Sequence, residues 1–88
     1  MAKLIVYKTL RCTQCMPFAA KLMERCAEEG ISVAIKEAEE ADVTILTVPT
    51  TVLYSDVEPP NIFPGVFNID RIIEEVWRIR DKEDETDL

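Results

Sequence analysis

The sequence predicts a single α/β domain in which a four-stranded mixed sheet is flanked by helices. Its apolar residues alternate between strand-like runs and helical spacing, in the order strand, helix, strand, short helix, strand, strand, helix. Its 88 residues can bury one modest core but not two, which excludes a two-domain protein. We therefore expect one domain over residues 1–80 and a disordered acidic tail over residues 81–88.

The first half of the chain is predicted to form a strand, a helix and a second strand. Leu4–Tyr7 is a short, unbroken apolar run, as in a strand that is buried on both faces. Residues 14–29 carry apolar side chains at helical spacing, with Pro17 in the first turn and Gly30 as a stop signal. Ile31–Ile35 is the predicted second strand, and a right-handed crossover through the helix makes it parallel to the first.

The second half is predicted to add a short helix, a hairpin and a final helix. The acidic segment 37–42 should form a short helix or helical turn with a solvated face. A third strand over Thr50–Ser55 and a fourth at residues 62–63 should form an antiparallel hairpin at the edge of the sheet. Asn68 can cap the last helix, which should end near Arg80. The apolar face of this helix, expected in the core, comprises Ile69, Ile72, Ile73, Val76 and Trp77.

The composition excludes several classes of function. The chain has no histidine, so it lacks Ser–His and Cys–His nucleophile pairs and histidine-containing zinc sites. Its net charge of -7 makes a nucleic-acid partner unexpected, because binding to a phosphate backbone needs clustered Lys and Arg. No apolar run approaches the roughly 18 residues of a membrane helix or resembles a signal peptide. We therefore expect no membrane partner and a cytoplasmic location.

The motif Cys12-Thr13-Gln14-Cys15 lies at the junction of the first strand and the first helix. Zinc and iron–sulfur sites also use this spacing, but they need four ligands, and the chain offers only one further thiol and no histidine. We therefore expect no metal and no cofactor. That third thiol, Cys26, lies about 16 Å along the helix from Cys15, too far for a disulfide, and is expected to be a buried core residue.

The two cysteines of the motif are expected to have different roles. Cys12 precedes the helix and should be exposed, which makes it the candidate nucleophile, whereas Cys15 lies in the first turn and should point toward the protein. The positive end of the helix dipole, together with Arg11 and Lys8, is expected to favour the Cys12 thiolate. Cys15 then resolves the mixed disulfide by attacking Cys12, which releases the reduced substrate.

A second signal strengthens the redox interpretation. Thr47-Val48-Pro49-Thr50 stands directly before the third strand, and Gly65 stands before the last helix. Together with the strand and the Cys-x-x-Cys helix, these features resemble the thioredoxin superfamily over residues 3 to about 80. The resemblance implies a thioredoxin-like fold of glutaredoxin size. It also implies that Pro49 follows a cis peptide bond and lies beside the dithiol, and that the backbone of Val48 pairs with the substrate.

The resemblance also bears on substrate and reductant. Thr47-Val48-Pro49 is similar to the glutaredoxin triplet that binds the cysteine moiety of glutathione, and Lys8 and Arg11 are the cations near it. Cys-Thr-Gln-Cys is closer to the Cys-x-Gln-Cys of the glutaredoxin-like redoxins that reduce ribonucleotide reductase. Gly65-Val66-Phe67-Asn68 more nearly matches the thioredoxin pattern. The reductant is therefore either a thioredoxin reductase-type enzyme or glutathione.

The predicted function is a cytoplasmic, monomeric thiol-disulfide oxidoreductase. It would reduce disulfides of protein substrates through a dithiol–disulfide cycle of Cys12 and Cys15, with Thr47, Val48 and Pro49 in substrate binding. Two alternatives stay open: a glutathione-dependent glutaredoxin, and a thioredoxin-fold module that binds a partner without turnover.

Overall fold

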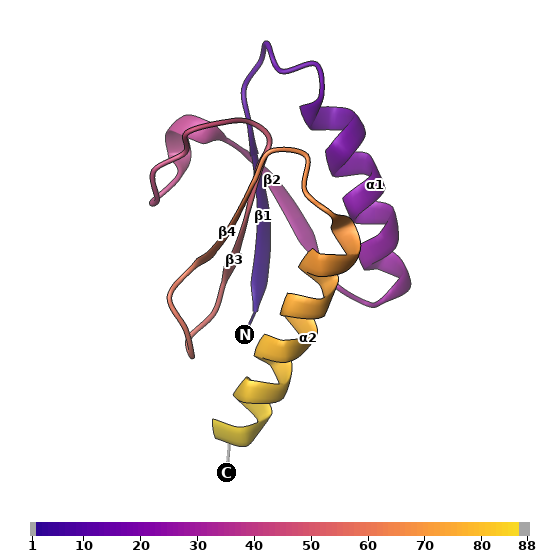
Figure 1. The fold of residues 1–88 in the computed structure, drawn as a ribbon, viewed down its shortest axis with the longest axis vertical. Coiled ribbons are helices and arrows are strands. Elements are labelled where there is room, and N and C mark those ends of the chain that lie inside the picture. The colour runs from indigo at the N-terminus through magenta and orange to yellow at the C-terminus, as the bar shows by residue number, and fades with distance from the viewer. Residues whose placement is uncertain (1, 87–88) are drawn as a thin grey trace.

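The computed structural model describes residues 2–86 and contains a four-stranded sheet with two α-helices (Figure 1). The strands lie in the order β2–β1–β3–β4. The central strand β1 (Lys3–Lys8) pairs in parallel with β2 (Val33–Glu37) and in antiparallel orientation with β3 (Thr50–Tyr54). The edge strand β4 (Asn61–Pro64) is antiparallel to β3. The mixed sheet with an antiparallel hairpin at one edge, predicted from the sequence, is confirmed.

Both helices, α1 (Cys15–Glu28) and α2 (Ile69–Thr86), pack on one face of the sheet (Figure 1). Side chains alternate between the two faces of a strand, so Leu4 and Val6 of β1 point toward the helices. On this face, Leu4 and Val6 pack against the apolar stripes of α1 and α2 and form the main core with them. Its almost fully buried members include Leu4, Val6, Leu22, Cys26, Leu53, Ile72, Val76 and Ile79.

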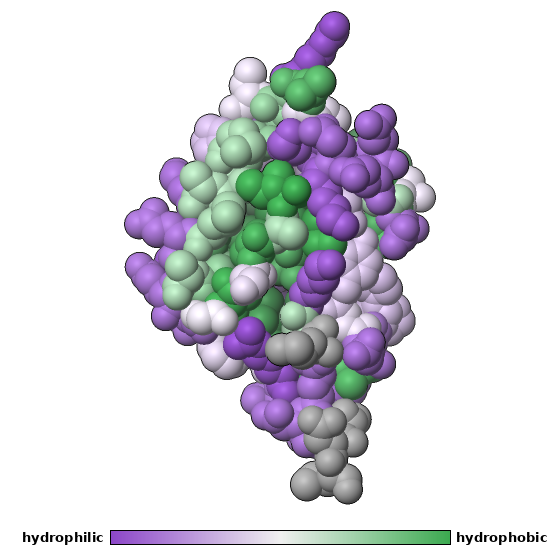
Figure 2. Space-filling model, turned by 180° about the vertical axis from the view of Figure 1, so that it is seen from behind, coloured by the Kyte–Doolittle hydropathy of each residue, from purple (hydrophilic) through white to green (hydrophobic). Residues whose placement is uncertain are grey.

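The second face of the sheet, formed by Ile5, Tyr7 and Val52, is covered by an irregular segment. The short helix expected over residues 37–42 is a single 3₁₀ turn, Ala38–Glu40. Beyond this turn the chain has no regular structure as far as Thr50, and its residues Val43 and Ile45 pack against the sheet. Seen from behind, the molecule has apolar side chains gathered in the middle and charged side chains around them (Figure 2).

The end of α1 explains why β2 begins later than expected. Gly30 has a φ of +71°, a left-handed conformation that favours glycine, and it confirms the predicted stop signal. The N–H of Ile31 donates to the carbonyl of Cys26 at 2.8 Å, which closes a Schellman motif. Ile31 is therefore buried as part of this reversal. The predicted strand over Ile31–Ile35 is wrong in its bounds, since β2 covers Val33–Glu37.

The start of α2 agrees with the sequence, but its apolar face differs at one position. The side chain of Asn68 accepts a hydrogen bond from the N–H of Arg71 at 3.3 Å, as expected of a cap. Trp77, expected in the core, is 40% exposed. Its ring lies at the margin of the apolar stripe, with the guanidinium of Arg80 5.0 Å from its centroid. Ile79, one turn after Val76, takes the buried position instead.

The final helix continues to Thr86, so the predicted disorder after Arg80 is wrong for residues 81–86. Partners from other parts of the chain hold this extension. Lys82 pairs with Glu58 at 3.0 Å, and Glu83 accepts a hydrogen bond from the backbone N–H of Ala2 at 3.1 Å. Residues 87–88 of the predicted tail lie outside the described residues. Neither α2 nor α1 has the length and apolar character needed to cross a bilayer.

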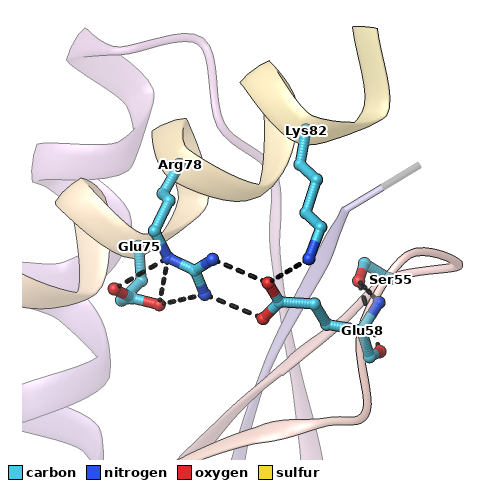
Figure 3. Close-up of polar contacts among 5 residues, drawn as sticks. All are labelled: Ser55, Glu58, Glu75, Arg78 and Lys82. Atoms are coloured by element: carbon cyan, nitrogen blue, oxygen red, sulfur yellow. Dashed lines mark hydrogen bonds and ion pairs between the residues drawn. The ribbon is translucent and has the colours of Figure 1, made fainter. Parts of the chain in front are cut away.

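A cluster of charges ties the β3–β4 hairpin to α2 (Figure 3). Glu58, in the hairpin, accepts hydrogen bonds from the two terminal nitrogens of Arg78 at 2.7 and 2.8 Å and one from Lys82 at 3.0 Å. Arg78 also pairs with Glu75 one turn earlier, at 2.8 Å. The hydrogen bonds from Arg78, followed by the one from Lys82, lower the pKa of Glu58 to about 2.

This pKa predicts how Glu58 contributes to stability. The folded-state pKa lies below the ordinary value of 4.5, so the contribution is present above about pH 4.5 and is lost as the pH falls toward 2. We expect Glu58→Gln to lower the free energy of unfolding at pH 7 and to weaken its decline between about pH 4.5 and 2. Urea unfolding followed by circular dichroism checks this, with Glu24→Gln on the exposed surface of α1 as control. An equal loss at every pH would contradict the assignment.

Candidate functional site

The three motifs that the sequence analysis identified, which contain the dithiol, Pro49 and Gly65, lie at one end of the sheet. The register pairs Tyr7 near the end of β1 with Thr50 at the start of β3, so the loop after β1 and the loop before β3 leave the sheet together. Thr50 also pairs with Pro64, the last residue of β4. Because β2 is parallel to β1 and ends at Glu37 beside Lys8, the segments at this end of the sheet are 9–14, 38–49 and 65–68. The dithiol, the Val48–Pro49 bond and Gly65 are brought to the same end, although they are far apart in sequence.

Cys12 and Cys15 form a disulfide at the start of α1, with their Cα atoms 5.5 Å apart. Cys15 is the first residue of the helix and is only 1% exposed, whereas Cys12 lies in the preceding loop and is half-buried. The burial of Cys15 is confirmed, whereas Cys12, predicted to be exposed, is only partly so. Within residues 2–86, no group of three or more Cys, Asp or Glu side chains is arranged to hold a metal ion. The disulfide itself shows that these two cysteines can form a dithiol–disulfide pair.

The N-terminus of α1 is open toward the disulfide. Gln14, at the cap position, makes no side-chain capping hydrogen bond, and the first turn contains no acidic residue. The third residue of the helix is Pro17, which has no N–H to satisfy. The first N–H groups and the positive end of the helix dipole are thus not neutralised by the helix itself. This arrangement favours a thiolate at the loop cysteine, Cys12, once the disulfide is reduced.

The loop before β3 has the conformation that the resemblance implied. The Val48–Pro49 peptide bond is cis, and Pro49 is fully buried. The hydroxyl of Thr50 donates a hydrogen bond to the carbonyl of Thr47 at 2.6 Å, which holds the turn. Val48 is half-buried and Thr47 is exposed, so the backbone before Pro49 can be reached from solvent. The roles of Thr47, Val48 and Pro49 in substrate binding stay predictions.

Comparison with solved structures decides the fold. No family model and no curated protein sequence matches the chain. The germline-specific thioredoxin Deadhead of Drosophila melanogaster matches 88% of this chain and 79% of its own, with a TM-score of 0.67 and 10% identity. Fasciola hepatica thioredoxin matches the same shares, with a TM-score of 0.65 and 20% identity. The chain has a thioredoxin fold. The fold class predicted from the sequence is confirmed, and at these identities the likeness concerns the fold alone.

Within this thioredoxin fold, the two predicted cations near the dithiol have different surroundings. Lys8 Nζ lies 2.7 Å from Glu37 Oε1 on the neighbouring strand, because the parallel register places Lys8 beside Glu37. Arg11 is exposed in the loop next to Cys12. The sequence could not reveal the Lys8–Glu37 pair, since it depends on the register of two strands. Arg11 is therefore the better placed of the two to meet a substrate, and both assignments stay predictions.

The end of the sheet that carries the disulfide also has several exposed apolar side chains, which the sequence did not predict. Leu10 and Leu46 are both 91% exposed, in the loop before Cys12 and in the loop before the cis proline. Val66, after β4, and Met16, directly after Cys15, are also exposed. The strand order brings the segments that carry them to one end of the sheet, which no local sequence pattern shows.

Proposed function

We propose that this chain is a thiol-disulfide oxidoreductase that reduces protein disulfides through a cycle of Cys12 and Cys15. The observation that carries the proposal is the Cys12–Cys15 disulfide at the uncapped N-terminus of α1, with Cys12 half-buried and Cys15 almost fully buried. The thioredoxin fold of the two solved thioredoxins supports it, because their likeness covers 88% of the chain.

The reaction follows from the unequal burial of the two sulfurs. In the reduced protein, the Cys12 thiolate attacks one sulfur of the substrate disulfide, forms a mixed disulfide and expels the first substrate thiolate. The Cys15 thiol then loses its proton and attacks the Cys12 sulfur. The Cys12–Cys15 disulfide forms, the bond to the substrate breaks, and the second substrate thiolate leaves and takes up a proton. Two electrons thereby pass from the protein to the substrate.

The substrate that best fits this surface is a protein. Four exposed apolar side chains lie in the segments at the end of the sheet that carries the disulfide: Leu10, Met16, Leu46 and Val66. A polypeptide substrate can bury more of this apolar area than a small disulfide can. A cytoplasmic location suits a reducing cycle, because thiols are kept reduced there. We place the protein there as a monomer, without nucleic acid, membrane or cofactor as a partner.

The reductant must return two electrons to the Cys12–Cys15 disulfide. We favour a dithiol reductase of the thioredoxin reductase type over glutathione. The two carboxylates of glutathione need cations, and of Lys8 and Arg11 the first is already paired with Glu37. Recovery of thiols in the oxidised protein, with NADPH and either reductase system, distinguishes the two.

The proposal is tested by reduction of insulin in the presence of dithiothreitol. The parent should accelerate precipitation of the insulin B chain well above the rate with dithiothreitol alone, and Cys12→Ser should return it to that rate, because the attacking sulfur is lost. A thioredoxin-fold module that only binds a partner would show no acceleration beyond Cys12→Ser. That result would refute the proposed function.

A further inference from the structure

A cleft of about 720 Å³ opens beside the disulfide, between α1 and the segment that leads from β4 into α2. One end is formed by Thr13 and Gln14, the two residues between the cysteines. Near the other end, Arg25 of α1 and Asp70 of α2 form an ion pair of 3.1 Å across the cleft. Figure 1 shows the start of α2 beside the middle of α1. The walls between these ends are formed mainly by Pro17, Phe18, Val66, Phe67 and Ile69.

The middle of the cleft is apolar and preformed. Phe67 packs edge-to-face on Phe63, with ring centroids 5.2 Å apart, and this contact holds one wall in place. Phe18 is buried, while Pro17 and Val66 are exposed and present apolar surface to the opening. An apolar side chain of a bound polypeptide can therefore be removed from water here without rearrangement of the protein.

The far end of the cleft carries charges of both signs, Lys21 and Arg25 on α1 and Asp70 on α2. Arg25 is shared among Glu28, Glu29 and Asp70. Lys21, one turn before Arg25, is exposed, and its side chain has no hydrogen bond or ion pair with any of residues 2–86. Of the two basic side chains that line the cleft, Lys21 is thus the one whose ammonium group is left to pair with a carboxylate of a ligand, next to apolar surface.

The distance between the disulfide and Lys21 sets the length of a matching ligand. Lys21 follows Gln14 by about two helical turns, or roughly 11 Å along α1. An extended polypeptide advances about 3.3 Å per residue, so about three residues cover this distance. A substrate whose cysteine meets Cys12 can therefore place the side chain of the third or fourth neighbouring residue at Lys21.

We propose that this cleft binds the stretch of protein substrate next to its disulfide. It selects an apolar side chain beside the substrate cysteine and an Asp or Glu three or four residues away, which pairs with Lys21. The inference rests on the proposed function and adds the class of sequence that the site takes. Lys21 is the specificity-determining residue, because the carboxylate of Asp70 on the opposite wall is already held by Arg25.

Two model peptides test the proposal, each with its cysteine in a mixed disulfide with 2-mercaptoethanol. They share the sequence Cys-Phe-Ser-X-Gly, and X is Glu in one and Lys in the other. We expect the parent to reduce the Glu peptide with a kcat/KM about threefold higher than that for the Lys peptide, which is the size of effect expected of an exposed ion pair. Because salt screens exposed charges, this preference should shrink at high ionic strength. Lys21→Glu should reverse the preference. Lys3→Glu, the same charge change at the opposite end of β1, should leave it intact.

A neutral small disulfide, bis(2-hydroxyethyl) disulfide, distinguishes a role of the cleft in specificity from the oxidoreductase activity itself. Equal rates for the parent and Lys21→Glu on this substrate, together with the reversed peptide preference, support the cleft as the specificity site. If both proteins reduce the small disulfide but neither distinguishes the peptides, the cleft proposal is overturned and the proposed function stands. If the parent reduces no disulfide at all, the proposed function fails and the inference fails with it.

Discussion

Cys15→Ser should turn the protein into a covalent trap for its substrates. The variant keeps the half-buried Cys12, which still attacks the substrate disulfide, but it lacks the fully buried Cys15 sulfur that would release the product. After mixing the reduced variant with insulin, we expect a large share of it in a mixed disulfide through Cys12, and almost none for the parent. Non-reducing electrophoresis and peptide mass mapping measure the adduct, which dithiothreitol should remove.

The matched control for this trap is Cys12→Ser. It retains Cys15, which is only 1% exposed, so we expect little adduct and slow alkylation by iodoacetamide near neutral pH. Cys26 is fully buried and should not appear in the adduct of either variant. Comparable adducts through Cys15 and Cys12 would show that the two sulfurs are equivalent, and the assigned roles would then be wrong.

Leu22→Ala should bring the protein close to unfolding. Leu22 lies on α1 at the centre of the main core and is fully buried, so its truncation costs about 2 to 5 kcal/mol in lost burial and a residual cavity. A chain of 88 residues has a total free energy of unfolding of only about 5 to 10 kcal/mol. Denaturant unfolding followed by circular dichroism should show the midpoint falling by about half.

The neighbouring residue Met23 provides the control for this experiment. Its side chain is exposed on the same helix, so Met23→Ala should change the free energy of unfolding by less than about 0.5 kcal/mol. If Leu22→Ala were as mild as Met23→Ala, α1 could not be packed on the sheet as the structure shows it.

The features that the sequence predicted well are those with a local cause. The apolar run of β1, the helical spacing of α1 and the capping side chain of Asn68 each act within a few residues, and each is found in the structure. The position of the dithiol at the start of α1 follows from the same local order. The cis conformation of the Val48–Pro49 peptide bond was predicted from the family resemblance, which likewise depends on a short motif.

The features that the sequence did not predict depend on contacts between distant segments. The helix continues beyond Arg80 because Lys82 meets Glu58 and Glu83 meets the backbone of Ala2. The burial of Trp77 was overestimated because its spacing from Ile73 is helical, while the centre of the stripe lies toward Ile72, Val76 and Ile79. The cleft was missed for the same reason, since its walls come from segments about fifty residues apart.

Because Cys26 is buried, the rate at which its thiol reacts can be used to measure local opening of the core. In the oxidised protein it is the one cysteine outside the disulfide, and burial raises the pKa of its thiol. A thiol reagent can reach it only when α1 separates from the sheet, so its labelling rate measures how often the core opens. The same rate, compared between the oxidised and reduced forms, would show how strongly the small loop closed by Cys12 and Cys15 restrains the helix that follows it.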